Sequence, residues 1–143
     1  MSKLEINFPE NILFSTDITV HDSYINRGNH VGNSRYVDLC NETNLRFFRS
    51  RNTSEYMIGE QALLNTGFSV QLRSEAKYAD ILTISLAVNN FHRCGCDFIF
   101  KIVNKNSQYL VAMARLSFLT FDFQQGKVVD AAASFKSFFK EDR

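Results

Sequence analysis

Four long runs of alternating apolar and polar residues fill the second half of this chain. Side chains in a strand point to opposite faces in turn, so a period of two predicts strands with one face packed inward. The inward-facing sets are Phe68, Val70 and Leu72; Leu82, Ile84, Leu86 and Val88; Phe98, Phe100 and Ile102; and Leu110, Ala112, Ala114, Leu116 and Phe118. Turn signals separate the runs, at Tyr78-Ala79-Asp80, Asn89-Asn90, Asn104-Lys105-Asn106-Ser107 and Gln124-Gln125-Gly126-Lys127. Their lengths are mostly those of hairpins, which favours an antiparallel sheet.

The first half of the chain predicts one long helix over residues 34–49. Its apolar positions fall on one side, with Asn33 as the candidate N-cap; they are Tyr36, Val37, Cys40, Thr43, Leu45, Phe47 and Phe48. A strand-like run precedes it at 12–20, and residues 131–140 could form a terminal helix. We therefore expect a single α+β domain over residues 1–143, in which a five- or six-stranded antiparallel sheet wraps around a long central helix.

Composition excludes several classes of protein. The formal net charge is +1 and no Lys or Arg stripe is present, so nucleic-acid binding has little support. No apolar run reaches the ~18 residues of a membrane span, and the N-terminus lacks a signal-peptide core, so we expect a cytoplasmic protein. The spacing Cys94-Gly95-Cys96 is too close for a zinc knuckle, and we interpret these thiols as structural, with no metal.

The stretch between the first strand and the helix, residues 25–33, carries the chemistry. It reads Ile-Asn-Arg-Gly-Asn-His-Val-Gly-Asn, a composition that tolerates left-handed turns and presents polar groups. The helix begins where this loop ends, so the helix's unpaired N–H groups face the loop. Such a place can hold an anion or polarise a carbonyl.

This loop, followed by Tyr36 and Glu42, resembles the first signature of the 4-hydroxybenzoyl-CoA thioesterase-like branch of hotdog-fold acyl-CoA thioesterases. Residues 75–82, Glu-Ala-Lys-Tyr-Ala-Asp-Ile-Leu, are similar to its second signature, in which a hairpin turn carries Tyr-x-Asp-x-Leu. The resemblance covers residues 10–130. It implies a hotdog fold and a homodimer or homotetramer with active sites between subunits.

The chain departs from that family at one position. The family's catalytic Asp stands four residues before the His; here Asn26 holds that place before His30, and Tyr24 stands two residues earlier. An Asn side chain donates and accepts hydrogen bonds but cannot act as a general base. Some relatives place an acid on the central helix instead, and Glu42 is the residue here that could serve.

We therefore expect an acyl-CoA thioesterase that hydrolyses an acyl thioester to free acid and coenzyme A. Glu42 acts as base, Asn26 and His30 orient water or thioester, and N–H groups at the helix start stabilise the oxyanion. The substrate-contacting candidates are Tyr24, Gly32, Asn33 and Tyr36, and the candidates for coenzyme A phosphates are Arg73, Lys77 and Arg93. No cofactor is expected; coenzyme A would be present only as part of the substrate. The sequence leaves open whether coenzyme A or a carrier protein bears the acyl group. The alternatives are a non-catalytic acyl-CoA or acyl-carrier-binding hotdog protein, or a hotdog enoyl-thioester hydratase or dehydratase.

Plainer interpretations also fit these residues. The Asn residues of the loop could be turn and cap residues, and His30 could satisfy a loop carbonyl. Glu42 stands four residues before Arg46, which favours an ion pair on the helix surface. Asp80 could be structural, and scattered basic residues are often only solvated.

Overall fold

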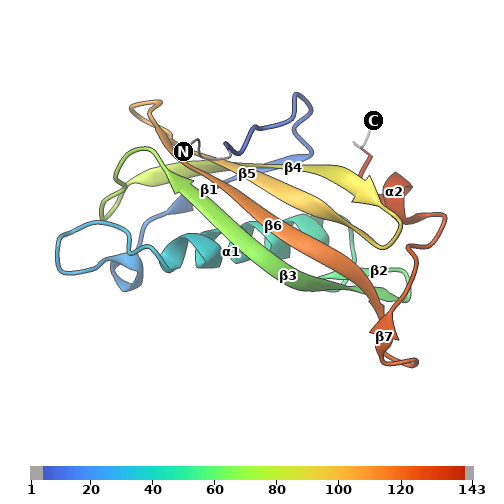
Figure 1. Ribbon diagram of the computed structural model, residues 1–143. Helices are drawn as coiled ribbons and strands as arrows, with labels where there is room; N and C mark the ends of the chain where they lie inside the picture. The colour runs from blue at the N-terminus through green and yellow to red at the C-terminus, as the bar shows by residue number, and fades with distance from the viewer. Residues whose placement is uncertain (1–4, 141–143) are drawn as a thin grey trace.

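The structure, a computed structural model, describes residues 5–140 (Figure 1). Its helical segments are η1 (Asp22–Tyr24), α1 (Arg35–Ser50) and α2 (Phe135–Phe138). Its strands are β1 (Phe14–Thr19), β2 (Met57–Ile58), β3 (Gln61–Leu72), β4 (Ile81–His92), β5 (Gly95–Asn104), β6 (Leu110–Asp122) and β7 (Lys127–Val128). The predicted order of a strand, a loop, a long helix and four long strands is confirmed, and the terminal helix is a single short turn within the predicted range.

All strands pair antiparallel in one sheet with the order β1-β4-β5-β6-β3-β2, and β7 pairs with β6. The hotdog fold expected from the sequence is therefore confirmed, with five long strands and two of only two residues each. One connection differs from the prediction. The turn signal at Tyr78-Ala79-Asp80 does not close a hairpin, because β3 and β4 are not neighbours in the sheet; residues 73–80 instead cross from the end of β3 to the start of β4.

The helix α1 lies against one face of the curved sheet, as Figure 1 shows. It packs mainly against β1 and β4, on one side of the sheet. Under this half, the helix-facing residues of β4 and β5 are fully buried; they are Leu82, Ile84, Leu86, Cys96, Phe98, Phe100 and Ile102. The helix contributes Tyr36, Leu39, Cys40, Thr43, Asn44, Phe47 and Phe48 to the buried interior.

The other half of the same face is not covered in this way. Phe68 and Leu72 of β3 pair with Leu116 and Ala112 of β6, which point toward the helix side. Yet Phe68 is 38% and Leu72 is 48% exposed. The predicted helix residues Val37 and Leu45 are only half-buried for the same reason. The chain thus leaves an open apolar region between α1 and β3.

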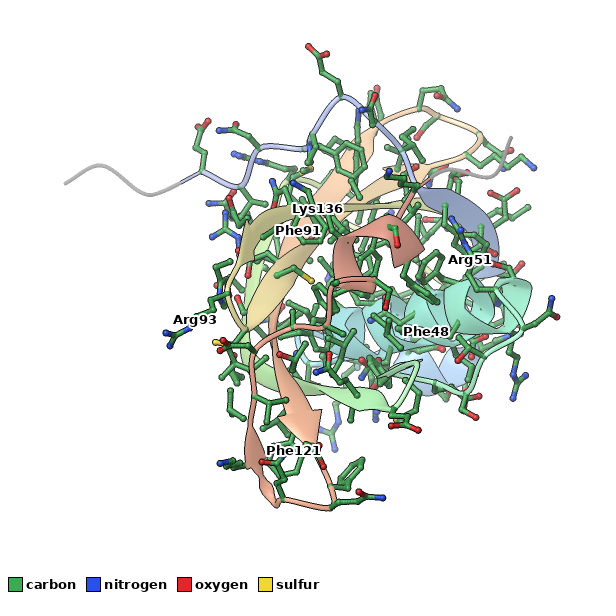
Figure 2. The ribbon with its side chains drawn as sticks, turned by 90° about the vertical axis from the view of Figure 1, so that its right-hand side faces the viewer. Phe48, Arg51, Phe91, Arg93, Phe121 and Lys136 are labelled. Atoms are coloured by element: carbon green, nitrogen blue, oxygen red, sulfur yellow. The ribbon has the colours of Figure 1, made fainter. Side chains whose placement is uncertain are left out.

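The C-terminal segment closes one end of the covered half. Phe135 and Phe139 are buried there, and Phe139 lies 5.6 Å from Phe98 and 6.4 Å from Phe47 between ring centroids. In Figure 2, which looks at this end, α2 lies above the end of α1, and Phe138 contacts the rings of Phe47 and Phe48. Within residues 5–140, no helix combines the length and the apolar character that crossing a bilayer requires.

Candidate functional site

The loop over residues 25–33 is closed by its own backbone. Ile25 and Val31 form an isolated antiparallel bridge, and the Asn26 N–H donates to the His30 carbonyl at 2.9 Å. The side-chain Oδ1 of Asn26 accepts from the N–H groups of Gly28 at 3.0 Å and His30 at 3.4 Å. The oxygen of Asn26 is therefore used to shape the loop, and its amide nitrogen is the part that can act on a ligand.

The glycines of the loop do not take the roles that their sequence suggests. The left-handed conformation falls on Asn29, with φ of 60°, and on neither Gly28 nor Gly32. The N–H of Gly32 donates to the Tyr24 carbonyl at 3.0 Å. Gly32, a substrate-contacting candidate from the sequence, therefore has no free N–H to offer a ligand.

The helix start does present open donors. Helix α1 begins at Arg35, and Ser34 rather than Asn33 precedes it, without a side-chain cap. Among residues 5–140, the N–H groups of Asn33 and Ser34 donate to no protein acceptor. Together with the partial positive charge of a helix N-terminus, they can stabilise a negatively charged oxygen.

A cavity of about 310 Å³ opens beside this helix start. It brings together five of the residues that the sequence singled out, on the loop, the helix and the crossover. The lining comprises Asn26, His30, Val31, Asn33, Tyr36, Leu72, Arg73, Ser74 and Glu75. Burial raises the pKa of the Tyr36 phenol, and the negative charge of Glu75 raises it further, so this hydroxyl keeps its proton at neutral pH.

An imidazole and a carboxylate meet in this cavity. The Nδ1 atom of His30 lies 2.9 Å from Oε2 of Glu75; the two are close, although the ring N–H direction is not aligned as in a hydrogen bond. The crossover brings Glu75 here because the Val31 N–H donates to the Ala76 carbonyl at 2.9 Å. The other side of the ring lies close to Gly28, where an added Cβ would be 2.8 Å from Nε2.

Sequence reasoning missed Glu75 as a site residue. A signal for it was present, because Glu75 is the first residue of the second signature, but that signature by itself points only to the fold. What the sequence could not provide was the crossover that places this residue beside His30.

A second, larger cavity of about 620 Å³ lies between α1 and strands β3 and β6. Its lining contains two further predicted residues, Glu42 and Tyr24. The full lining comprises Tyr24, Val37, Asp38, Asn41, Glu42, Leu45, Glu55, Tyr56, Leu63, Asn65, Leu116 and Phe118. We call this cavity the acyl groove.

The carboxylate of Glu42 already has a partner. Its Oε2 accepts from Arg46 Nε at 2.8 Å, and Arg46 also donates to Thr16 Oγ1 and the Asp17 carbonyl, both at 2.8 Å. Glu42 also stands two turns along the helix from Arg35, about 10 Å at 1.5 Å per residue. Within one chain, therefore, the three predicted catalytic residues do not share a cavity: Asn26 and His30 lie together, and Glu42 lies apart.

The three basic candidates are separated as well. Arg73 lines the small cavity, whereas Lys77 lies in the exposed part of the crossover. Here the Asp80 carboxylate accepts from the Lys77 N–H at 2.9 Å, so Asp80 shapes the turn. Arg93 follows β4, about 36 Å of strand away from Asp80, and pairs with Asp130 at 3.2 Å. Figure 2 shows its side chain pointing away from the body of the protein.

Comparisons with solved structures agree with this architecture. The chain is 16% identical to Slr0204, a 1,4-dihydroxy-2-naphthoyl-CoA thioesterase from Synechocystis, covering 88% of this chain and 94% of that one with a TM-score of 0.77. It is 18% identical to YbaW, a probable thioesterase from Escherichia coli, covering 87% and 94% with a TM-score of 0.72. A hypothetical protein from Staphylococcus aureus, characterised in complex with CoA, is 15% identical, with coverage of 94% and 85% and a TM-score of 0.77.

At these identities the likeness establishes the shared fold. No curated protein matches the chain. The family comparison goes further, because the model of the thioesterase-like superfamily matches residues 20–139, which include the loop, the whole of α1 and the crossover. The chain is therefore a member of the thioesterase-like superfamily.

Proposed function

We propose that this protein is an acyl-CoA thioesterase, which hydrolyses an acyl thioester to a free acid and coenzyme A. The observation that carries the proposal is the small cavity, which is lined by both His30 and Asn33, the latter with an open N–H just before α1. The superfamily match supports it, as do a structural neighbour named for a CoA thioesterase activity and another characterised with CoA.

In the proposed mechanism, the thioester carbonyl oxygen accepts hydrogen bonds from the N–H groups of Asn33 and Ser34. A water oxygen attacks the carbonyl carbon, and the negative charge that develops on the carbonyl oxygen is stabilised at the helix start. One donor of this kind can be worth about 3–4 kcal/mol in the transition state. When the tetrahedral intermediate collapses, the carbon–sulfur bond breaks and coenzyme A leaves as a thiol.

Two residues compete for the role of base. His30 has the better geometry in one chain, because Glu75 faces its Nδ1 and leaves Nε2 to take the proton of the attacking water and return it to the sulfur. The amide nitrogen of Asn26 can orient that water. Glu42, the base expected from the sequence, reaches a thioester at this helix start only if it comes from a second subunit.

A second subunit is part of the proposal. Within residues 5–140, the outer edge of β3 from Leu64 to Leu72 has no strand beside it, since β2 pairs only with Gln61 and Ala62. Unpaired strand edges attract other strands. We propose a homodimer in which the two β3 edges pair and the exposed side chains of Phe68 and Leu72 become buried, with the small cavity at the interface.

Coenzyme A is assigned to the basic residues at the mouth of the small cavity. Arg73 lines that cavity and Lys77 follows in the same crossover, so both can meet phosphates. Arg93 of the same chain stands at the opposite end of the sheet and is left out of this assignment.

A second candidate function is an acyl-CoA-binding protein that has no hydrolytic activity. The observation that favours it is Asn26, which stands where the family has an acid and whose side-chain oxygen accepts hydrogen bonds within the loop. In this case the pocket would bind a thioester and release no thiol.

A thiol-release screen over a panel of acyl-CoAs separates the two functions. We expect turnover by the wild type and a loss of about 100-fold in kcat for His30→Gln, the scale of losing a general base. Glu75→Gln should lower the rate less, because it removes only the group that faces the imidazole. No release by the wild type, together with release by Asn26→Asp, would support the binding protein.

The same screen tests Glu42 against its ion pair. If Glu42 is the base, Glu42→Gln should lose about 100-fold in rate while the matched Arg46→Gln loses little. If Glu42 serves only the ion pair, the two variants should behave alike, with small effects on rate and melting temperature.

A further inference from the structure

The acyl groove has one apolar side and one side that is rich in hydrogen-bond acceptors. Leu45, Leu63, Leu116 and Phe118 supply apolar surface for a hydrocarbon chain. The other side includes Asp38, Asn41, Glu55 and Tyr56, to which the proposed mechanism gives no role. An inference about this wall rests on the proposed function, because it describes the part of the substrate beyond the thioester.

Tyr56 is held in place by its surroundings. Its backbone has φ of 60°, an uncommon conformation for a bulky side chain. Its ring packs against Phe48 and Phe118, with centroid distances of 5.4 Å and 5.7 Å. Its hydroxyl donates to Asn41 Oδ1 at 2.9 Å and accepts from Asn44 Nδ2 at 3.3 Å. The hydroxyl oxygen therefore occupies a fixed position in the groove wall.

This network has acceptor capacity to spare. The proton of the Tyr56 hydroxyl is committed to Asn41, and one of its two lone pairs is used by Asn44, so one lone pair is open. Asn44 is fully buried and does not line the groove, so the acceptor that the groove presents is the Tyr56 hydroxyl oxygen. An acceptor with an open lone pair favours a ligand that brings a hydrogen-bond donor.

The charges that face the groove have the same preference. Three carboxylates line it, and no Lys, Arg or His among residues 5–140 does. Each carboxylate has an Arg partner outside the lining, in the pairs Asp38–Arg35 at 3.2 Å, Glu42–Arg46 at 2.8 Å and Glu55–Arg49 at 3.4 Å. A ligand thus meets the negative members of these pairs, and a terminal carboxylate would be repelled.

We propose that the acyl groove selects uncharged acyl chains that carry a hydroxyl group over chains of the same length that end in a carboxylate. Tyr56 is the specificity-determining residue, and its hydroxyl oxygen accepts the hydrogen bond of the substrate's hydroxyl.

Three thioether analogues of equal chain length test this selection without hydrolysis: S-hexyl-CoA, S-(6-hydroxyhexyl)-CoA and S-(5-carboxypentyl)-CoA. Titration calorimetry on the wild type should find the hydroxyhexyl compound bound at least threefold more tightly than the hexyl compound. The carboxypentyl compound should bind at least tenfold more weakly than the hexyl compound. A carboxypentyl compound that binds as tightly as the hexyl compound would overturn the inference.

Two variants locate the selection. Tyr56→Phe keeps the ring, so it should remove the hydroxyl preference and make the hydroxyhexyl and hexyl compounds bind alike. Tyr109→Phe, at an exposed tyrosine outside the groove, is the matched control and should keep the preference. Equal weakening of both compounds by Tyr56→Phe would mean that the residue serves only the fold. Glu55→Gln should recover affinity for the carboxypentyl compound alone.

The corresponding thioesters separate this inference from the proposed hydrolysis. If the analogues bind in the expected order and the thioesters release no thiol, the selection stands and the thioesterase proposal fails. If the thioesters are hydrolysed with no discrimination between end groups, the thioesterase proposal stands and the selection fails. If no analogue binds, the assignment of this groove to the acyl chain is wrong.

Discussion

The two halves of the helix-facing side of the sheet come from the same sequence pattern but have different surroundings. Over β4 and β5, alternate apolar residues such as Ile84 and Phe98 are fully buried against α1. Over β3, Phe68 and Leu72 continue the same alternation and remain 38% and 48% exposed. The two cavities described above lie on the β3 side. The alternating pattern thus indicates which side chains face the helix side of the sheet. The position of α1 decides which of them are buried within the same chain.

The largest expected effect on stability comes from a substitution in the half of the sheet that α1 covers. Phe98 is fully buried with its ring 4.7 Å from that of Phe118, so Phe98→Ala should lower the free energy of unfolding by about 3–5 kcal/mol, the usual cost of truncating a buried Phe. Phe68→Ala should cost less, about 1–2 kcal/mol, because Phe68 is only partly buried and water can fill the space. Urea unfolding of both variants at one low protein concentration measures the difference. If Phe68→Ala loses as much stability as Phe98→Ala at high protein concentration, and less at low concentration, a second chain covers Phe68.

This comparison also shows how far the sequence could lead. The period of two predicted β3 to β6, and the helical spacing predicted α1 to within one residue at each end, because these patterns are local. The strand order could not be read, since the pairing of β1 with β4 joins residues far apart in the chain. For this reason the sequence favours a hairpin at the turn signal Tyr78-Ala79-Asp80, which instead ends the crossover over residues 73–80.

The candidate site divides in the same way. The loop and its place at the start of α1 followed from residue types that favour turns and helix ends. The contact of His30 with Glu75 depended on the crossover, and the separation of Glu42 from the loop depended on the length of helix between them. Val37 and Leu45 were predicted to face the core, yet they line the acyl groove because the helix covers only half of the sheet.

The next effect concerns what covers the β3 half. A charge placed at Phe68 would have to be buried if two β3 edges pair, so Phe68→Asp should weaken self-association by about 100-fold, or about 2.7 kcal/mol. Sedimentation at micromolar concentration should find a dimer for the wild type and a monomer for the variant. Leu64→Asp places the same charge on the opposite face of β3 and is the control. A wild-type monomer at this concentration would contradict the proposed interface.

A smaller effect tests the small cavity through substitutions at Gly28 and Gly32, the two glycines of the loop beside it. A Cβ at Gly28 would lie 2.8 Å from two atoms of the His30 ring, whereas a Cβ at Gly32 meets only Arg35 Cγ at 3.8 Å. Gly28→Ala should therefore displace the imidazole and lower kcat about tenfold, or about 1.4 kcal/mol. Gly32→Ala should stay within about twofold of the wild type, since its N–H still donates to Tyr24. Equal rates for both variants would exclude His30 as the base.

The last test uses the reactivity of the three thiols to report on the half of the sheet that α1 covers. Burial raises the pKa of Cys96 to about 12, and burial also raises the pKa of Cys40, both of which face the interior beside α1. Because these pKa values are higher in the folded protein, the two thiols favour folding fully below their unfolded pKa of about 8.5, and that contribution falls as pH rises toward the folded values. Only Cys94, which is half-buried in the turn between β4 and β5, is open to a reagent.

At pH 8, therefore, one thiol per chain should react with a thiol reagent in minutes, and the other two at least about a thousandfold more slowly, through unfolding. Cys94→Ser should abolish the fast phase, and denaturant should merge the phases of the wild type. A second thiol that reacts fast at pH 8 would mean that the half of the sheet under α1 is not protected from solvent, in contrast to the comparison drawn above.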